Sequence, residues 1–326
     1  MRKALTTSTT ILPIAFVVGS VLWILPEAGN LLLWGGWFVG ILTTYIWMET
    51  NARQQLIRER SRMVSTTFFL AMVSVPLLHE FSLASLLPLA LQFSYVCLLA
   101  AYQGRRPEGK MFHAFLLLGL SALLLPQVLW LVPLLLFSCG LHLRSLTLSS
   151  LWATLMALLL PLVGYFLWAL AKWDFSPLVT FLEQTHQALI TLNWEYWQSI
   201  YTATPATLPT SDWQFLASAG GTLLLSLIAI VNQVRTSFLD KIRVRMFYYL
   251  MALVQGGFTV LLILYPEERW SWLLLLITNG APLIAHYFTL TRGWLCSTIF
   301  WITFLTLILL TFFNYQTEWI LSLIFS

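Results

Sequence analysis

Charged residues are scarce in this chain. They make up 9% of its 326 residues, whereas hydrophobic residues make up 59%. A typical soluble domain has about 25% charged residues, so a soluble fold of this length could not cover so much apolar surface. The composition therefore excludes a water-soluble protein and predicts an all-helical, polytopic membrane protein.

Cysteine is also scarce, and motifs for metal or nucleotide chemistry are missing. Cys97, Cys139 and Cys296 lie in apolar runs without paired spacing, which predicts small buried side chains. The sequence shows no phosphate-binding glycine loop, metal-ligand cluster or nucleophile elbow. We therefore expect no metal and no cofactor. Membrane topology explains the net charge of +4 better than nucleic-acid binding does, so no nucleic-acid partner is expected.

The interior of the apolar runs lacks charge. No Asp, Glu, Lys or Arg falls well inside any of them. A charge at mid-bilayer costs about 2.5–3.5 kcal/mol on insertion scales and usually marks an ion or proton path. This absence argues against a proton-coupled pump or an ion channel, but it leaves open a carrier of lipid-like substrates.

Charged residues, proline and glycine divide the chain into about eleven candidate spans. The runs are 11–25, 30–48, 64–78, 82–102, 112–125, 128–143, 150–171, 214–234, 246–265, 270–290 and 294–313. The end of the first run reads WILPE and offers no small-x-small cleavage site, so we expect a retained helix rather than a signal peptide. We divide the chain into an N-terminal bundle (1–171), a loop (172–213) and a C-terminal bundle (214–326).

The positive charges predict the orientation. If the N-terminus is cytoplasmic, alternation leaves only Lys172 and Arg269 of the 17 Lys and Arg residues on the outer side. This bias follows the positive-inside rule and predicts a cytoplasmic N-terminus. Most carboxylates fall on the outer side, which gives that face a net negative field.

The stretch from Gly104 to Arg144 has the pattern of a membrane hairpin. It runs from a basic loop through an apolar run to a break at Pro126, and through a second apolar run back to a basic residue. Fourteen residues span about 21 Å, less than the roughly 30 Å hydrocarbon core. The region 112–143 is therefore either a re-entrant pair or two tilted spans.

The same region resembles a known protein family. Glu80-Phe81 forms a short turn, a charged loop leads into Phe112-x-Ala114, and Gly119 begins a run that ends at Pro126. This pattern is similar to that of an uncharacterised family of polytopic inner-membrane proteins of Bacteroidota, over about residues 10–165. The resemblance implies a multi-pass protein of the bacterial inner (cytoplasmic) membrane and carries no activity.

The loop 172–213 is the one long connection. Ser176-Pro177 predicts a helix start, and apolar residues interleaved with polar ones predict an amphipathic helix. Trp194 and Trp197 would lie at headgroup level. We expect a linker helix resting on the bilayer, or alternatively a lid over a substrate.

Few polar residues are candidates for chemistry. Glu80, with His79 and Glu27 as weaker candidates, would lie at the outer mouth of the bundle, where multi-spanning lipid-linked glycosyltransferases keep a base or metal ligand. The short first outer loop argues against such an enzyme. Solvated turn residues are the simpler interpretation.

Other candidates belong to a substrate-binding surface. Glu183 and His186 share one helix face at a spacing of three residues, but the sequence offers no further metal ligands. Trp194 and Glu195 follow in the same loop. His286, near the end of its span, is predicted to make a polar contact between helices, with a proton relay as the alternative.

The sequence therefore favours a non-catalytic protein that is accessory to envelope assembly or transport, embedded in lipid, with a protein partner. One alternative is a lipid-linked transferase or flippase with an outer-facing site. The other is a carrier for an uncharged or amphiphilic solute, which predicts a polar cavity lined by Asn279, His286 and Gln255.

Overall fold

The computed structural model describes residues 2–8, 10–203 and 209–325, with side chains from residue 5 to residue 311 of these ranges. The described chain is helical and contains no strand, which confirms the predicted all-helical class. The α-helices are α1 (Arg2–Thr7), α2 (Ile11–Ile24), α3 (Leu31–Gln54), α4 (Met63–Val73), α5 (Leu87–Ala101), α6 (Glu108–Leu124), α7 (Leu131–Leu141), α8 (Leu148–Lys172), α9 (Ser176–Ile190), α10 (Glu195–Thr202), α11 (Thr210–Thr236), α12 (Ile242–Leu264), α13 (Arg269–Leu290) and α14 (Trp294–Phe325). Short 3₁₀ turns are η1 (Leu25–Glu27), η2 (Pro76–Leu78), η3 (Leu83–Leu86), η4 (Pro126–Trp130), η5 (Ser237–Leu239) and η6 (Pro266–Glu268).

A helix covers each of the eleven predicted runs, but fewer helices are long enough to cross a bilayer unaided. Seven segments of the described chain are sufficiently long and apolar: α3, α5 with η3, α8, α11 with η5, α12, α13 with η6, and the first part of α14. The apolar helices α2, α4 and α7 are shorter. The structure therefore supports a multi-pass membrane protein without confirming eleven spans.

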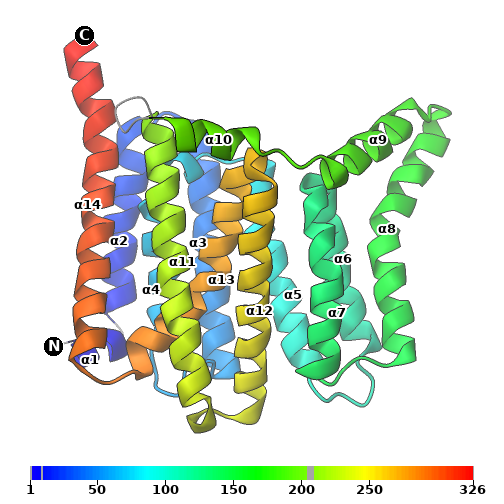
Figure 1. Ribbon diagram of the computed structural model, residues 1–326, viewed down its shortest axis with the longest axis horizontal. Helices are drawn as coiled ribbons and strands as arrows, with labels where there is room; N and C mark the ends of the chain where they lie inside the picture. Colours follow the sequence, from blue (N-terminus) through cyan, green and yellow to red (C-terminus); the bar gives the residue numbers. More distant parts are fainter. Residues whose placement is uncertain (1, 9, 204–208, 326) are drawn as a thin grey trace.

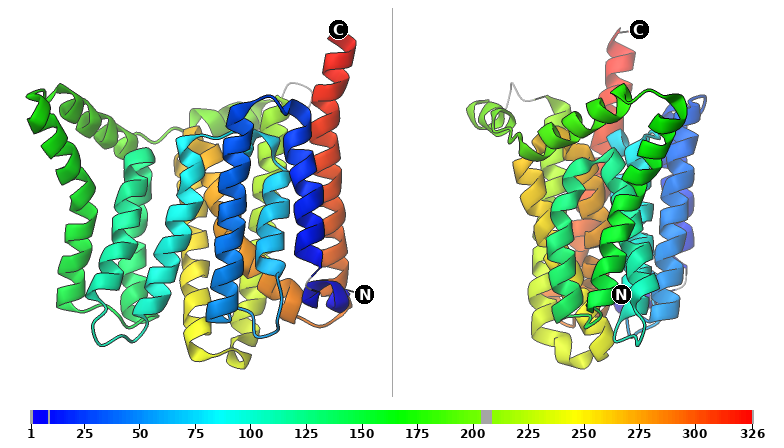
Figure 2. Two further views of the ribbon diagram at one scale, coloured as in Figure 1. Left: turned by 180° about the vertical axis from the view of Figure 1, so that it is seen from behind. Right: turned by 90° about the vertical axis from the view of Figure 1, so that its right-hand side faces the viewer.

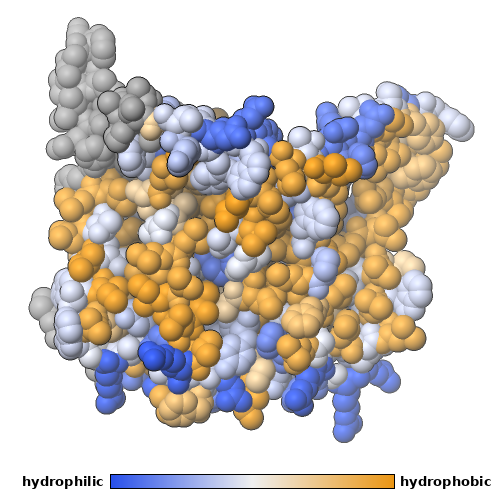
Figure 3. All heavy atoms as spheres, in the orientation of Figure 1, coloured by the Kyte–Doolittle hydropathy of each residue, from blue (hydrophilic) through white to orange (hydrophobic). Residues whose placement is uncertain are grey.

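The surface divides into an apolar belt with a hydrophilic region at each end (Figure 3). The helices run roughly parallel through the belt, and the connections after α3, α5, α7, α11 and α13 lie at one end (Figures 1 and 2). Basic side chains join these connections: Arg58 donates to the carbonyl of Leu239, Lys241 to Gln55, and Arg243 to the carbonyl of Leu99. We call this end the basic face. The opposite end, where η1 and η6 carry Glu27, Glu267 and Glu268, is the acidic face. The side chains of Arg2, Lys3 and Glu318 lie outside the described residues.

Helix α13 lies at the centre of the bundle. Nearly all of its side chains from Ser271 to Thr289 are buried, and it packs against α4, α5, α11 and α12. It is apolar around most of its circumference, as expected for a helix enclosed by others. The division at residues 171 and 213 stays a prediction, because in space α13 joins helices from both ends of the chain.

The hairpin α6–α7 and helix α8 form the other side of the molecule (Figure 1). Helix α6 packs against α5 and α8, and α7 meets α12. The 17 residues of α6 correspond to about 26 Å, so the helix is shorter than the hydrocarbon core.

The loop 172–213 forms two helices on the acidic face. The structure begins α9 at Ser176, but the cap comes from Asp174, whose carboxylate accepts from the backbone N–H and the hydroxyl of Ser176. Helix α10 lies across the ends of the spans (Figure 1). Trp197 donates to the carbonyl of Ile263, which fixes α10 to the end of α12.

Gly36 allows the turn before η3 to rest directly on α3. A Cβ at this position would overlap the carbonyl oxygen of His79, and Phe81 donates its backbone N–H to the carbonyl of Leu32 nearby. The backbone of the turn cannot move aside without losing that contact.

We therefore expect Gly36→Ala to lower the free energy of unfolding in detergent by about 1–3 kcal/mol, because the added methyl overpacks a buried contact. Gly220→Ala is the matched control, since a Cβ at Gly220 meets nothing within 4 Å. Equal thermal stability of the two variants would contradict the packing argument.

Candidate functional site

The central helix α13 carries two buried polar side chains on one face. Asn279 and His286 lie seven residues apart, about two turns, so they project in similar directions. Both are almost completely buried. A buried polar group is costly unless it has a hydrogen-bond partner, so the partners of these two residues determine what the centre of the bundle can do.

Asn279 is the centre of a network at mid-height. Its amide N–H₂ donates to the Gln255 side chain at 2.6 Å and to the carbonyl of Met251 at 2.9 Å. Its oxygen accepts from the hydroxyl of Tyr95. Gln255 in turn donates to the hydroxyl of Ser226 at 3.2 Å. The network therefore joins α5, α11, α12 and α13 and uses both ends of the Asn279 amide.

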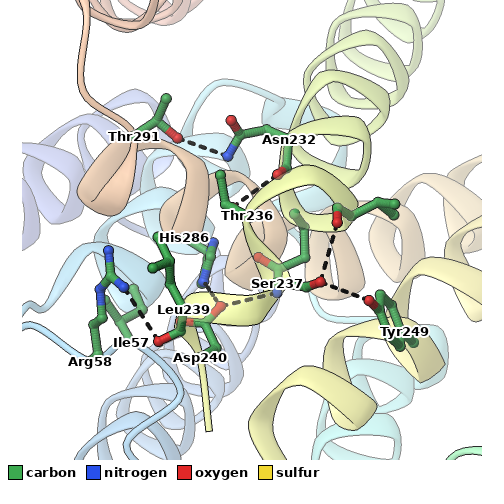
Figure 4. Close-up of polar contacts among 12 residues, drawn as sticks. Ile57, Arg58, Asn232, Thr236, Ser237, Leu239, Asp240, Tyr249, His286 and Thr291 are labelled. Atoms are coloured by element: carbon green, nitrogen blue, oxygen red, sulfur yellow. Dashed lines mark hydrogen bonds and ion pairs between the residues drawn. The ribbon is translucent and has the colours of Figure 1, made fainter. Parts of the chain in front are cut away.

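His286 forms a buried pair with Asp240. The Nε2 atom of His286 lies 3.0 Å from Oδ2 of Asp240, and the side chains are 3% and 4% exposed (Figure 4). Gln233 donates to the same oxygen at 3.2 Å. Asp240 lies in the short connection between η5 and α12, so the pair attaches the turn between α11 and α12 to the central helix.

The environment keeps Asp240 ionised. Burial alone would raise the pKa of this carboxyl. The hydrogen bond and charge of His286 oppose burial, with help from Gln233 and from the charge of Arg58, and the pKa is lowered below its usual value. The carboxylate is therefore available as a hydrogen-bond acceptor at neutral pH.

Further hydrogen bonds surround the pair (Figure 4). Asn232 donates to Thr291 at 2.8 Å, and Tyr249 donates to Ser237 at 2.9 Å. These contacts connect α11 to the end of α13 and η5 to α12. The basic-face ends of three helices are thus held together by polar groups rather than by apolar packing alone.

The space beside the pair is small. A cavity of about 30 Å³ is lined by Arg58, Asp240 and His286 together with Thr236, Leu239, Leu290 and Thr291. This is room for about one water molecule. The Tyr248 ring lies edge-on to His286, with 4.7 Å between ring centroids, and its buried hydroxyl has no protein partner among the described residues. The arrangement can hold a proton or a water, but it cannot hold a solute.

His79 has a structural setting. Its ring stacks on Trp23 with 4.1 Å between centroids, and its Nε2 lies 3.2 Å from the carbonyl oxygen of Met72. Burial lowers the pKa of His79 from 6.5 to about 4, although hydrogen bonds to the carbonyls of Met72 and Val73 oppose the shift. The ring is therefore neutral at physiological pH.

The structure brings Glu27 and Glu80 together. The Asn30 amide donates to Glu27 at 3.2 Å and to Glu80 at 3.0 Å, so two turns of the acidic face share one side chain. His79 points away into the core and does not join these carboxylates, because its polar contact is with Met72.

The loop candidates lie elsewhere. Glu183 and His186 are exposed on α9, while Trp194 and Glu195 begin α10. Figure 1 places α9 far along the molecule from α2 and α3, so Glu183 and His186 do not form a site with Glu80.

Asp240 was not among the candidates predicted from the sequence. It lies between the apolar runs 214–234 and 246–265, and nothing in its local sequence distinguishes it from a surface carboxylate. The one available signal was its position at the end of the bundle where His286 also lies.

We expect Asp240→Ala to lower the free energy of unfolding by about 3–5 kcal/mol, because it leaves His286 buried without its partner. Asp240→Ala combined with His286→Ala should cost less than the sum of the two single changes. Chemical unfolding in detergent measures all three. Glu183→Ala is the exposed control and should stay within about 0.5 kcal/mol. Additive single effects would contradict the pairing.

We also expect acid to destabilise the fold through His79. Its pKa is lower in the folded protein than the unfolded value of 6.5, so stability is complete above pH 6.5 and falls as the pH approaches 4. The loss reaches about 3 kcal/mol. The difference between wild type and His79→Asn, measured by unfolding from pH 7 to pH 4, should show this loss, and His186→Asn should not alter it.

Comparison with known proteins adds no identity to this geometry. No family model, curated protein or solved structure matches the chain. What is established is the coarse class, a helical protein with several apolar helices suited to a membrane.

Proposed function

We propose that this chain is a non-catalytic protein of the bacterial inner membrane that is accessory to envelope assembly or transport. The observation that carries the proposal is the closed polar centre of the bundle. Asn279 is hydrogen-bonded directly to both Gln255 and Tyr95, and the space beside His286 holds about one water. A protein with this interior acts through its surfaces.

The distribution of charge supports the proposed membrane and orientation. The basic side chains of Arg58, Lys241 and Arg243 lie on one face, where each donates a hydrogen bond to a different segment of the chain. Cytoplasmic loops of inner-membrane proteins carry this excess of Lys and Arg. We therefore assign the basic face to the cytoplasm and the acidic face to the outer side.

The geometry gives little support to the solute carrier. That alternative requires a polar cavity lined by Asn279, His286 and Gln255. Asn279 and Gln255 are instead hydrogen-bonded directly, at 2.6 Å, and His286 is paired with Asp240. A solute would have to break these contacts in a buried environment, where each unsatisfied group costs about 1–3 kcal/mol.

A lipid-linked transferase or flippase is the second candidate. Two features favour it. The loop 172–213 is held over the ends of the spans by the hydrogen bond of Trp197, and Glu27 and Glu80 lie together on the same face. The Asn30 amide donates a hydrogen bond to each carboxylate, so neither carboxylate is free to act as a general base.

Gentle extraction of the tagged chain from its own membrane, followed by native mass spectrometry, tests the proposal. We expect a protein partner at fixed stoichiometry. A retained polyprenyl-linked lipid in place of a protein would favour the transferase or flippase.

Glu80→Gln separates the two candidates further. Partner binding should be unchanged in this variant if the role is accessory, because Glu80 has no catalytic task. Gly36→Ala serves as the comparison, since it disturbs the same turn by packing alone. Loss of function in Glu80→Gln with normal insertion and stability would argue for the enzyme.

A further inference from the structure

A groove of about 730 Å³ lies between α7 and α12. Its walls are Trp130, Leu131 and Leu134 on one side and the outer half of α12 on the other. Leu189, Ile190 and Leu192, from the end of α9 and the linker to α10, close it toward the acidic face. The lining is almost entirely apolar.

Two adjacent glycines of α12 shape this groove. A Cβ at Gly257 would lie 2.9 Å from Leu131 and 3.3 Å from Leu134, so this glycine allows α7 to approach. A Cβ at Gly256 would meet nothing within 4 Å. Gly257 therefore sets the contact between the helices, and Gly256 leaves the groove floor empty.

Hydrogen bonds hold the segment between α9 and α10 against the end of α12 and close this end of the groove. The Tyr265 hydroxyl donates to the carbonyl of Leu189 at 2.6 Å, and the Asn193 amide donates to Glu267 at 2.7 Å. A chain inside the groove therefore leaves it sideways rather than through the acidic face.

The open side of the groove faces the apolar belt. Trp130, Ile190 and Val260 line it and are more than half exposed, and α12 is one of the helices suited to cross the membrane. The surface over this part of the molecule is apolar (Figure 3). In a membrane the medium on this side is hydrocarbon, not water.

The shape of the groove favours a lipid chain over a transmembrane helix. A helix that crosses the bilayer is straight and about 30 Å long. Such a helix would meet the segment with Leu189, Ile190 and Leu192, which closes the groove toward the acidic face. A flexible hydrocarbon chain can bend around this segment.

The rim of the groove favours a cationic headgroup. Glu267 and Glu195 are exposed beside Asn193, and Glu268 is the next residue along the chain. The nearby Arg269 is already engaged, 3.0 Å from Asp212 and over the ring of Tyr196. A phosphate alone would meet carboxylates, whereas an ammonium group would be attracted to them.

We propose that this groove binds one acyl chain of an aminophospholipid of the outer leaflet, with the ammonium group beside Glu267. Lipid tails are as apolar as the groove, so the chain contributes fit and the headgroup contributes selectivity. The choice of the outer leaflet rests on the proposed orientation, whereas the binding itself is independent of the accessory role.

Native mass spectrometry of the purified full-length protein tests the site. The delipidated protein is mixed with phosphatidylethanolamine and phosphatidylglycerol of identical chains. We expect one phosphatidylethanolamine to be retained by the wild type. Gly256→Trp should reduce that retention by about tenfold, because the indole fills the groove.

Gly221→Trp is the matched control. Gly221 is also an exposed glycine of a long apolar helix with nothing within 4 Å of its Cβ, but it does not line the groove. This variant should retain the lipid. Glu267→Gln should remove the preference for phosphatidylethanolamine, and Glu183→Gln, an exposed carboxylate of the same face, should keep it.

Three results would overturn the proposal. Equal retention by Gly256→Trp and Gly221→Trp would place the bound lipid elsewhere. A preference for phosphatidylglycerol would refute the headgroup assignment. A small membrane protein that the gently extracted wild type retains and the gently extracted Gly256→Trp variant loses would identify a helix as the occupant. A failed lipid test leaves the partner experiment unaffected, because the two read out different molecules.

Discussion

The enclosure of α13 governs the rest of the structure. A helix surrounded by other helices meets neither water nor lipid, so its polar side chains must find partners inside the bundle. Asn279 takes its partners from α5 and α12, and His286 takes Asp240 from the turn that follows α11. These two contacts fix which helices surround α13 and hold their ends in register. Among the described residues, the direct contacts of Asn279 and His286 leave no solute-sized polar space beside these two side chains, which is a consequence of the same requirement.

The periphery is built on a different principle. Helix α8 and the described part of α14 expose most of their apolar side chains, and the grooves beside α7 and α14 open from the surface of the belt. Without a hydrophobic driving force between helices in lipid, such elements associate by close packing, as Gly257 does with Leu131. The molecule thus combines a polar, rigid centre with apolar surfaces that lipid or a partner helix can reach. Both the proposed accessory role and the lipid site rely on those surfaces.

The sequence predicted the apolar helices but not the centre. Apolar runs and charged breaks located the helices that cover the eleven predicted runs, because hydrophobicity and length dominate in a membrane protein. Hydropathy does not distinguish helices that face lipid from helices that face protein. Helix α8 is more apolar than α13 and yet mostly exposed, whereas α13 is almost wholly buried. The pairing of Asp240 with His286 depends on contacts 46 residues apart, which local pattern does not report.

The position of α13 near the end of the chain has a consequence for biogenesis. Tyr95 and its partner Asn279 are separated by 184 residues. At synthesis rates of about 5–20 residues per second, Tyr95 enters the membrane roughly 10–40 s before Asn279 exists. During that interval α4 and α5 surround a vacant centre, and their polar groups need temporary partners from lipid headgroups, water or the insertion machinery. Assembly of this bundle is therefore completed from the inside, by the late arrival of the helix around which the others are arranged.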